Sequence, residues 1–352
     1  MDGMWHTVKE YFTGSNNPLQ FCSHLCELDS YPGKNNNTEY GVELDEDCMR
    51  IFSALGDVSR PPCTCNETRP LCDHIDAYIK NHPEHHSKDY TIHTDKGDTC
   101  VEEVCRYVMR DVLQWWAHWN GFIEGHRWKH LYIAFVAIVD EIAIPPQDVA
   151  DGSFRLLGNS LADVLEGLRL EGVHPDDIKL LEMYLWRQCI IQYLEKVDPA
   201  IRQILIGKAT LMTLWRVLTA GTHGVAVCIL TSKGIRPQGQ TDHALEMASA
   251  CDAISMDMGK EALGILQDEP TETVAGKDRE MLKRELRWVY LRALGSLDQD
   301  PRGAVLRRFA TSGWHYVLLN DRYRERVAHV RFPMSPYLRC RIAAYYKSGW
   351  YS

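Results

Sequence analysis

The stretch LYIAFVAIVDEIAIPP, residues 131–146, decides the fold of this protein. Nine nearly unbroken apolar residues precede two acids, and two prolines end the segment. A helix that is apolar on all sides must be buried, so the stretch predicts a helix at the centre of a helical bundle. A buried carboxylate is costly unless it is paired or bound to a metal, which places Asp140 and Glu141 at the rim of an apolar cavity. The alternative is that the helix simply emerges into solvent here.

Most of the chain has the apolar spacing of helices, and we recognise no hairpin or alternating strand pattern. The sequence therefore predicts an all-α protein of about ten or eleven helices. The first 45 residues, which are polar and broken by Gly, Pro and Asn, are predicted to be an N-terminal extension, with one α-helical domain over residues 46–352. The helices are expected within residues 45–56, 71–82, 98–123, 126–143, 160–172, 175–197, 209–234, 241–266, 278–297 and 304–327.

The composition excludes one class of partner. The chain has 352 residues and a net charge of −9. Binding a nucleic acid requires a basic surface to neutralise phosphates, so we expect no nucleic-acid partner. The sequence shows neither the apolar core of a signal peptide nor an apolar run long enough to span a membrane, so we expect a cytoplasmic protein.

Cysteines are concentrated near the N-terminus, where eight of the 12 precede residue 106. The segment PPCTCNETRPLCDH, residues 61–74, suggests zinc, because thiolate and imidazole are its usual ligands. No second cysteine pair follows at the spacing of a zinc finger. We therefore favour reduced cysteines with a structural role and keep zinc as the alternative.

A second group of acids lies in CDAISMDMGKEA, residues 251–262. Asp252 and Ser255 offer oxygen ligands, and Lys260 offers a cation beside them. Asp257 and Glu261 are four residues apart, so one helical face presents both. Asp257 lies about 200° around the helix from Ser255, so these two cannot bind the same ion unless the helix bulges.

Arginines also occur beside aromatic residues in two helical segments. Arg187 lies in the largely apolar segment LEMYLWRQCIIQYLE, residues 181–195, where a guanidinium needs an anionic partner. The segment SGWHYVLLNDRYRERV, residues 312–327, places Arg322 and Tyr323 about two turns beyond Trp314. Taken alone, each arginine is also compatible with an ordinary salt bridge.

The order of these features resembles the class I terpene cyclases, and most closely the trichodiene synthase group of fungal sesquiterpene cyclases. The best match is GWHYVLLNDRYR, residues 313–324, which looks like the late helix of that group with its Arg-Tyr pair. TLWRVLTAGTHGVAVCIL, residues 213–230, is similar to its Gly-containing helix that lines the cavity. The resemblance spans residues 100 to 330, roughly.

The resemblance implies a helical bundle around a central apolar cavity. It also implies that the protein ionises an isoprenoid diphosphate, with farnesyl diphosphate as the expected substrate, with the help of Mg²⁺ and cyclises it as part of secondary metabolism. Aromatic residues are candidates for the cavity wall, although core packing is the better explanation for any single one: Tyr132, Phe135, Trp186, Trp215 and Trp314. The implied metal ligands are Asp140, Glu141, Asp252, Ser255, Asp257 and Glu261. The implied catalytic residues are Arg187, Lys260, Arg322 and Tyr323, with Arg216 as the alternative to Arg187 for sensing the diphosphate. We expect Asp140, Arg187, Ser255 and Arg322 to face one mouth of the bundle.

Both metal motifs depart from the pattern of the family. The last acid of the first motif is replaced by Ile144. If Ser255 keeps its register in the second motif, the other two ligand positions become Cys251 and Gly259. An alternative is therefore a cyclase-like enzyme that uses the cavity for metal-independent terpenoid chemistry, and a third is a non-catalytic helical binding protein. A homodimer is left open.

Overall fold

The computed structural model describes residues 42–43, 91–94, 97–101, 126–142, 144–198, 200, 216, 218–239, 242–262, 287–319 and 330–331. The chain divides into two compact units. The larger unit comprises Pro62–Met258 and Thr271–Tyr316, and the smaller one comprises Met1–Pro61, Gly259–Pro270 and Val317–Ser352. The predicted extension over residues 1–45 lies outside the described residues except for residues 42–43.

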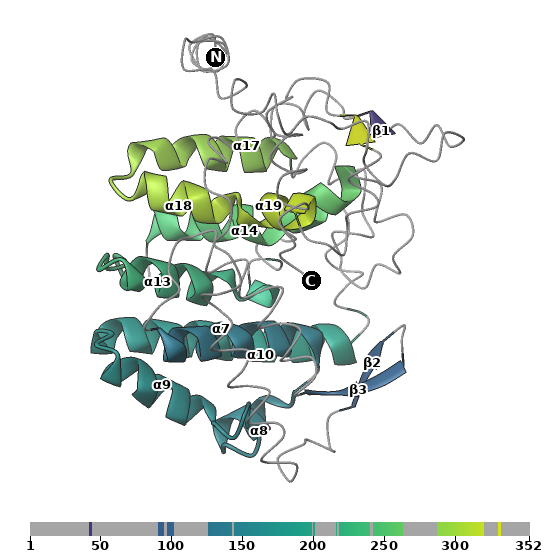
Figure 1. The fold of residues 1–352 in the computed structure, drawn as a ribbon, viewed down its shortest axis with the longest axis vertical. Coiled ribbons are helices and arrows are strands. Elements are labelled where there is room, and N and C mark those ends of the chain that lie inside the picture. The colour runs from purple at the N-terminus through teal and green to yellow at the C-terminus, as the bar shows by residue number, and fades with distance from the viewer. Residues whose placement is uncertain are drawn as a thin grey trace, which may run out of the picture. The chain divides into compact units, whose positions relative to one another are not determined.

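The all-α class predicted from the sequence is confirmed for the described residues (Figure 1). The helices are α7 (Arg127–Glu141), α8 (Pro146–Ala150), α9 (Leu161–Leu170), α10 (Pro175–Val197), α13 (Thr222–Ser232), α14 (His243–Ala262), α17 (Arg287–Ser296), the 3-10 helix η6 (Leu297–Gln299), α18 (Gly303–Ala310) and α19 (Ser312–Leu319). Among these helices, none is long and apolar enough to cross a membrane.

Helix α7 lies at the core of the larger unit, as its apolar stretch predicts. It packs beside α10, with α9 along one flank and α13 along the other (Figure 1). Tyr132, Ile133, Ala134 and Phe135 have no exposed surface. The buried hydroxyl of Tyr132 donates to the backbone oxygen of Leu181 at 2.8 Å, so its burial leaves no unsatisfied donor.

Local sequence signals explain where α9 and α10 begin. Ser160 and Asp163 form a capping box, in which each side chain accepts a hydrogen bond from the backbone amide of the other. Pro175 occupies the first turn of α10, where its missing N–H has no helical partner to lose. The bounds of α10 are those predicted from its apolar spacing.

Two segments predicted as single helices are interrupted. Before α13 the chain turns at Ala220 and Gly221, and Gly221 has a φ of 61°. A Cβ at this position would lie 2.4 Å from the side-chain oxygen of Gln188, so only glycine fits both the backbone and the space. The last predicted helix is likewise divided at Thr311, a turn between α18 and α19.

The expectation that no strand would occur is wrong at two short ladders. Strands β2 (Thr91–Thr94) and β3 (Gly97–Cys100) pair antiparallel, with Thr94 opposite Gly97. Strands β1 (Val42–Glu43) and β4 (Val330–Arg331) pair in parallel within the smaller unit. The β2–β3 hairpin was missed because it is short and its Thr and Gly residues lack a clear apolar alternation.

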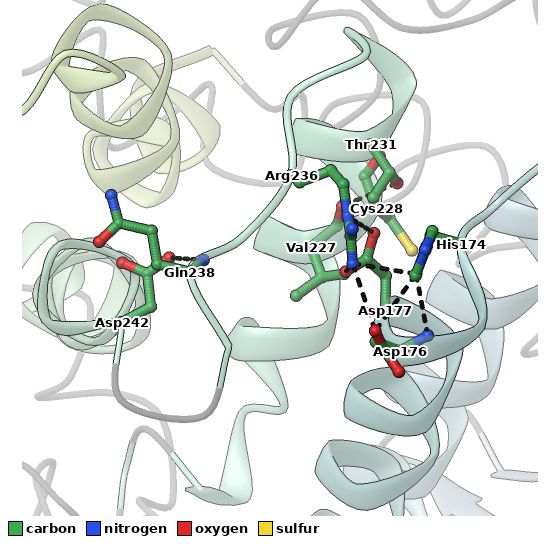
Figure 2. A network of polar contacts seen from close by, with 9 residues as sticks. All are labelled: His174, Asp176, Asp177, Val227, Cys228, Thr231, Arg236, Gln238 and Asp242. Carbon is green, nitrogen blue, oxygen red and sulfur yellow. Dashed lines mark hydrogen bonds and ion pairs between the residues drawn. The ribbon is translucent and has the colours of Figure 1, made fainter.

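The segment between α13 and α14 is fixed by ion pairs at both ends. Arg236 donates from Nε and Nη2 to the two carboxylate oxygens of Asp177, at 3.1 and 3.2 Å, and also contacts His174 at the start of α10 (Figure 2). Asp242, which precedes α14, accepts two hydrogen bonds from the buried guanidinium of Arg302. These pairs hold the segment before α14 to α10 and to the start of α18.

Candidate active site

Asp140 lies where α7 ends, and α10 holds this end in place. The Asp140 side chain is exposed, and its Oδ1 accepts a hydrogen bond from Gln192 Nε2. The backbone oxygen of Asp140 accepts a hydrogen bond from Lys196 Nζ. The carboxylate therefore sits at the edge of the apolar core, at a position that α10 fixes.

A buried ion pair lies near this end of α7. Arg216 is only 9% exposed and Asp257 of α14 only 5%. Nε of Arg216 lies 2.9 Å from Oδ2 of Asp257. Because little water reaches them, the two charges interact more strongly than an exposed pair would.

Arg216 is influenced by more than one carboxylate. Burial by itself would lower the pKa of the guanidinium, but the charges of Asp257, Asp140 and Glu195 outweigh it and raise the pKa. Arg216 is therefore charged at every physiological pH. Acids from α7, α10 and α14 thus act on one buried cation.

Two buried glutamines of α10 organise the chain between Arg216 and α13. Gln188 Nε2 donates to the backbone oxygens of Val136 and Thr219, at 2.8 and 3.0 Å. Gln192 Nε2 also donates to the Thr219 oxygen, at 2.8 Å. Neither residue was predicted from the sequence, although two glutamines four positions apart in an apolar helix are a recognisable signal of a buried polar contact.

Ser255 and Asp252 lie against α19 and do not form part of this arrangement. Ser255 is fully buried and donates to the backbone oxygen of Asp252 at 2.8 Å. The Asp252 carboxylate accepts a hydrogen bond from Ser312. A Cβ on Gly313 would lie 2.1 Å from Ser255 Oγ, so α14 and α19 are in direct contact at this point. α14 thus presents Ser255 to α19 and Asp257 to Arg216.

Among the remaining predicted residues, Arg187 is not brought into this arrangement. Arg187 is exposed on α10, where its charge acts on Glu246 and Tyr184. Lys260 and Glu261 are half-buried at the end of α14, within the smaller unit. Arg322 and Tyr323 lie outside the described residues, and for Glu141 only the backbone is described.

The predicted metal ligands fit Mg²⁺ only in part. The carboxylates of Asp140 and Asp257 are the hard oxygen ligands that Mg²⁺ prefers, and both act on Arg216. Asp252 and Ser255 do not fit, because the Asp252 carboxylate accepts a hydrogen bond from Ser312 of α19 and the Ser255 hydroxyl donates to the backbone oxygen of Asp252. In the described part of the chain, no three His, Cys, Asp or Glu side chains are grouped closely enough to hold a metal ion.

Three of the cysteines are described with their side chains, and all three are free thiols. Cys189, Cys228 and Cys251 are buried, which raises the pKa of each thiol; that of Cys189 rises to about 12. These thiols are therefore protonated and unreactive, as expected for structural cysteines. The side chains of the cysteine-rich segment over residues 61–74, for which zinc was the alternative, lie outside the described residues.

A buried apolar helix that ends in an acid, facing a buried arginine in an all-α fold, is the arrangement of a class I terpene cyclase. Comparison with known proteins identifies the family within this class. The family model described as alpha-humulene synthase matches residues 98–349, so the chain belongs to the alpha-humulene synthase family.

Two curated relatives have the same description, and their similarity to this chain extends over most of their length. An alpha-humulene synthase of Phoma sp is 49% identical over 340 residues, which covers 95% of this chain and 89% of the relative. An alpha-humulene synthase of Sarocladium schorii is 42% identical over 349 residues, which covers 94% of this chain and 81% of the relative. The predicted resemblance to fungal sesquiterpene cyclases is confirmed, and with it the class of enzyme: a lyase that acts on an isoprenoid diphosphate.

Proposed function

We propose that this enzyme converts farnesyl diphosphate into the cyclic sesquiterpene alpha-humulene. The names of the two relatives support the product. The observation that carries the proposal is Arg216, a buried cation that acidic residues surround at the end of the most apolar helix. There the anionic diphosphate would meet the cation of Arg216, and the apolar isoprenoid chain would meet the apolar side chains of the helix.

In this proposal, Arg216 donates hydrogen bonds to the departing diphosphate. A buried donor that is held in place before the reaction stabilises developing negative charge more strongly than water does. Asp140 and Asp257 are the described residues that would hold Mg²⁺. The ion, when bound, supplies positive charge that stabilises the leaving group. In this proposal Arg216 senses the diphosphate, and not Arg187, which the sequence favoured for this role.

The apolar helices would also exclude water from the allylic carbocation that forms when the diphosphate leaves the substrate. Every residue of α13 from Thr222 to Leu230 is buried, and α13 packs on α7. A cation held among such residues has few nucleophiles to trap it before it cyclises and loses a proton. A central apolar cavity between these helices is part of the proposal.

The direct test is to incubate the purified protein with farnesyl diphosphate, with and without Mg²⁺, and to analyse the extract by gas chromatography and mass spectrometry. We expect alpha-humulene only when Mg²⁺ is present. Geranyl and geranylgeranyl diphosphate serve as substrates of the wrong length. A different cyclic product would contradict the proposed product alone, whereas the absence of any hydrocarbon or alcohol would contradict the proposed function.

Metal-independent terpenoid chemistry is the second candidate, and one observation favours it: Asp140, Asp252 and Asp257 all have protein partners. Arg322→Lys separates the two candidates. If the substrate is a diphosphate that Arg322 grips, this variant should lose most of its turnover, because lysine cannot donate two parallel hydrogen bonds. Turnover equal to that of the wild type, measured at saturating substrate, would favour the metal-independent reaction.

We further propose, from the sequence, a cytoplasmic location and leave a homodimer as the assembly to be tested. Fluorescence microscopy of the tagged full chain tests the location, and sedimentation equilibrium of the purified protein tests the dimer.

A further inference from the structure

A helix is interrupted between Arg216 and α13, and this break lies beside the candidate active site. The amide of Ala220 donates to the backbone oxygen of Arg216 at 3.0 Å, which closes a last helical turn. Gly221 then adopts a φ of 61°, and α13 begins at Thr222. In an unbroken helix, the backbone oxygen of Thr219 would accept from the amide four residues further along the chain. The left-handed residue inside that span ends the regular ladder, so this buried oxygen needs other donors.

The side-chain amides of Gln188 and Gln192 supply these donors. Both glutamines are buried, with exposed fractions of 0% and 4%. Each Nε2 group donates to the Thr219 oxygen, at 3.0 Å from Gln188 and 2.8 Å from Gln192. Each also donates to α7: Gln188 to the backbone oxygen of Val136 at 2.8 Å, and Gln192 to the carboxylate of Asp140. Two successive turns of α10 thus tie one carbonyl group to two successive turns of α7.

Hydrogen bonds within the last turn join Thr219 to Arg216. The Thr219 hydroxyl donates to the backbone oxygen of Arg216 at 3.2 Å. Nη1 of Arg216 donates back to that hydroxyl at 3.3 Å, and its Nε donates to Asp257 at 2.9 Å. The position of Thr219 therefore sets both the backbone and the guanidinium of Arg216.

The two glutamines are costly in a core that is otherwise apolar. Burying an amide is unfavourable unless it is hydrogen-bonded, and leucine would fill the same space without a polar group. The orientation of Gln188 even leaves its own Oε1 without a hydrogen-bond partner among the described residues. Buried polar contacts of this kind specify one arrangement of the helices. The glutamines therefore determine where the break lies.

We propose that Gln188 and Gln192 are positioning residues of the reaction: they hold the helix break at Thr219 and thereby fix the place of the Arg216 guanidinium. Neither glutamine acts on the substrate directly. The inference rests on the proposed function, because that function gives Arg216 its part in the reaction. Displacing a reacting or binding group by about 1 Å can cost about 10²-fold in rate, so the support of Arg216 matters to catalysis.

The first test is a double-mutant cycle of Gln188→Met with Arg216→Lys, measured as kcat and KM for farnesyl diphosphate with Mg²⁺. Methionine has a similar length but no donor. In the wild-type background, Gln188→Met should lower kcat about tenfold and change KM by less than about threefold. In the Arg216→Lys background it should lower kcat by less than about twofold, because the group that it positions is already gone.

Tyr290→Phe is the matched control, since the buried hydroxyl of Tyr290 also donates to a backbone oxygen of another helix, that of Ala310 at 3.4 Å. It should leave kcat unchanged in both backgrounds. Equal losses from Gln188→Met in the two backgrounds would overturn the inference, because the glutamine would then act independently of Arg216. Gln192→Met repeats the cycle at the second glutamine. If thermal unfolding shows that neither methionine variant folds, the glutamines are structural and the inference fails.

A spectroscopic test needs no substrate. The Nε–H signal of Arg216 in a nitrogen–proton correlation spectrum is assigned by its loss in Arg216→Lys. Gln188→Met should shift this signal, whereas Tyr290→Phe should not. An unchanged signal in Gln188→Met would overturn the inference, even if the wild type forms a sesquiterpene. A wild-type protein that converts no farnesyl diphosphate, with the expected shift in Gln188→Met, would overturn the proposed function instead.

Discussion

Arg187 and Arg216 have different surroundings. Their sequence context favoured burial of Arg187, but Arg216 is the buried one. Arg187 stands in an apolar segment yet lies exposed on α10. Arg216 is buried and paired with Asp257. An isolated buried charge is prohibitively costly, so the carboxylates that act on Arg216 are what allow it to be buried.

The first prediction compares these two arginines. Arg216→Lys should lower kcat/KM for farnesyl diphosphate by about 10² to 10³, because lysine offers a point charge in place of oriented guanidinium donors. Arg187→Lys is the matched control and should stay within about threefold of the wild type, since an exposed charge contributes little. Steady-state kinetics with circular dichroism to verify folding would measure this. Comparable losses in both variants would contradict the assignment of Arg216.

At the scale of elements, α14 decides the geometry of the site because its faces meet different neighbours. One face presents Ser255 closely to α19, and another presents Asp257 to Arg216. This arrangement follows from helical geometry, in which two residues of separation mean a rotation of about 200°. Ser255, the residue that best preserved the register of the family motif, is for this reason a packing residue in the described structure.

The second prediction tests the α14–α19 contact. Gly313→Ala should destabilise the protein by about 1 to 3 kcal/mol, because the new Cβ would clash with Ser255 and approach the backbone nitrogen of Met256 to 2.9 Å. Gly295→Ala in α17 is the control: no atom lies within 4 Å of its Cβ position, and alanine favours a helix over glycine by roughly 1 kcal/mol. Urea unfolding measures both, and equal stability of the two variants would refute the close contact.

For the whole molecule, acid should weaken the connection between α14 and α18. Burial would raise the pKa of Asp242, but hydrogen bonds from Arg302 and from two backbone amides outweigh it and lower the pKa below 3.8. Asp300 shows the same direction, because Arg302 donates to it as well. A carboxyl group whose pKa is lower in the folded state stabilises the fold fully above the unfolded pKa, and this contribution is lost as the pH falls through the folded value.

The third prediction follows from this linkage. The free energy of unfolding should be nearly constant from neutral pH down to about pH 5 and should fall below about pH 4. Asp242→Asn should be less stable than the wild type by about 3 to 5 kcal/mol at pH 7, since it leaves Arg302 buried with a weakened partner. The difference should narrow in acid, and urea unfolding across the pH range measures it. A difference that stays constant below pH 4 would show that charge is not its cause.

Much of this protein was determined by the sequence alone, because the signals are local. The nine apolar residues before Asp140 predicted the central helix, and the bounds of α10 followed from its apolar spacing. The ordered motifs also identified the class of enzyme, even though no single motif was complete. Periodicity and capping depend on residues within a few positions of one another, and one sequence contains all of that information.

Only the tertiary structure decided which residues meet. The turn at Gly221, with a φ of 61°, interrupts a helix, and it requires glycine because Gln188 and Val136, on two other helices, leave no room for a Cβ. Arg216 rather than Arg187 is buried because Asp257, 41 residues further along the chain, lies beside it. Helical spacing states which residues share a face, but the neighbour of that face is set by the packing of distant segments, which no local pattern records.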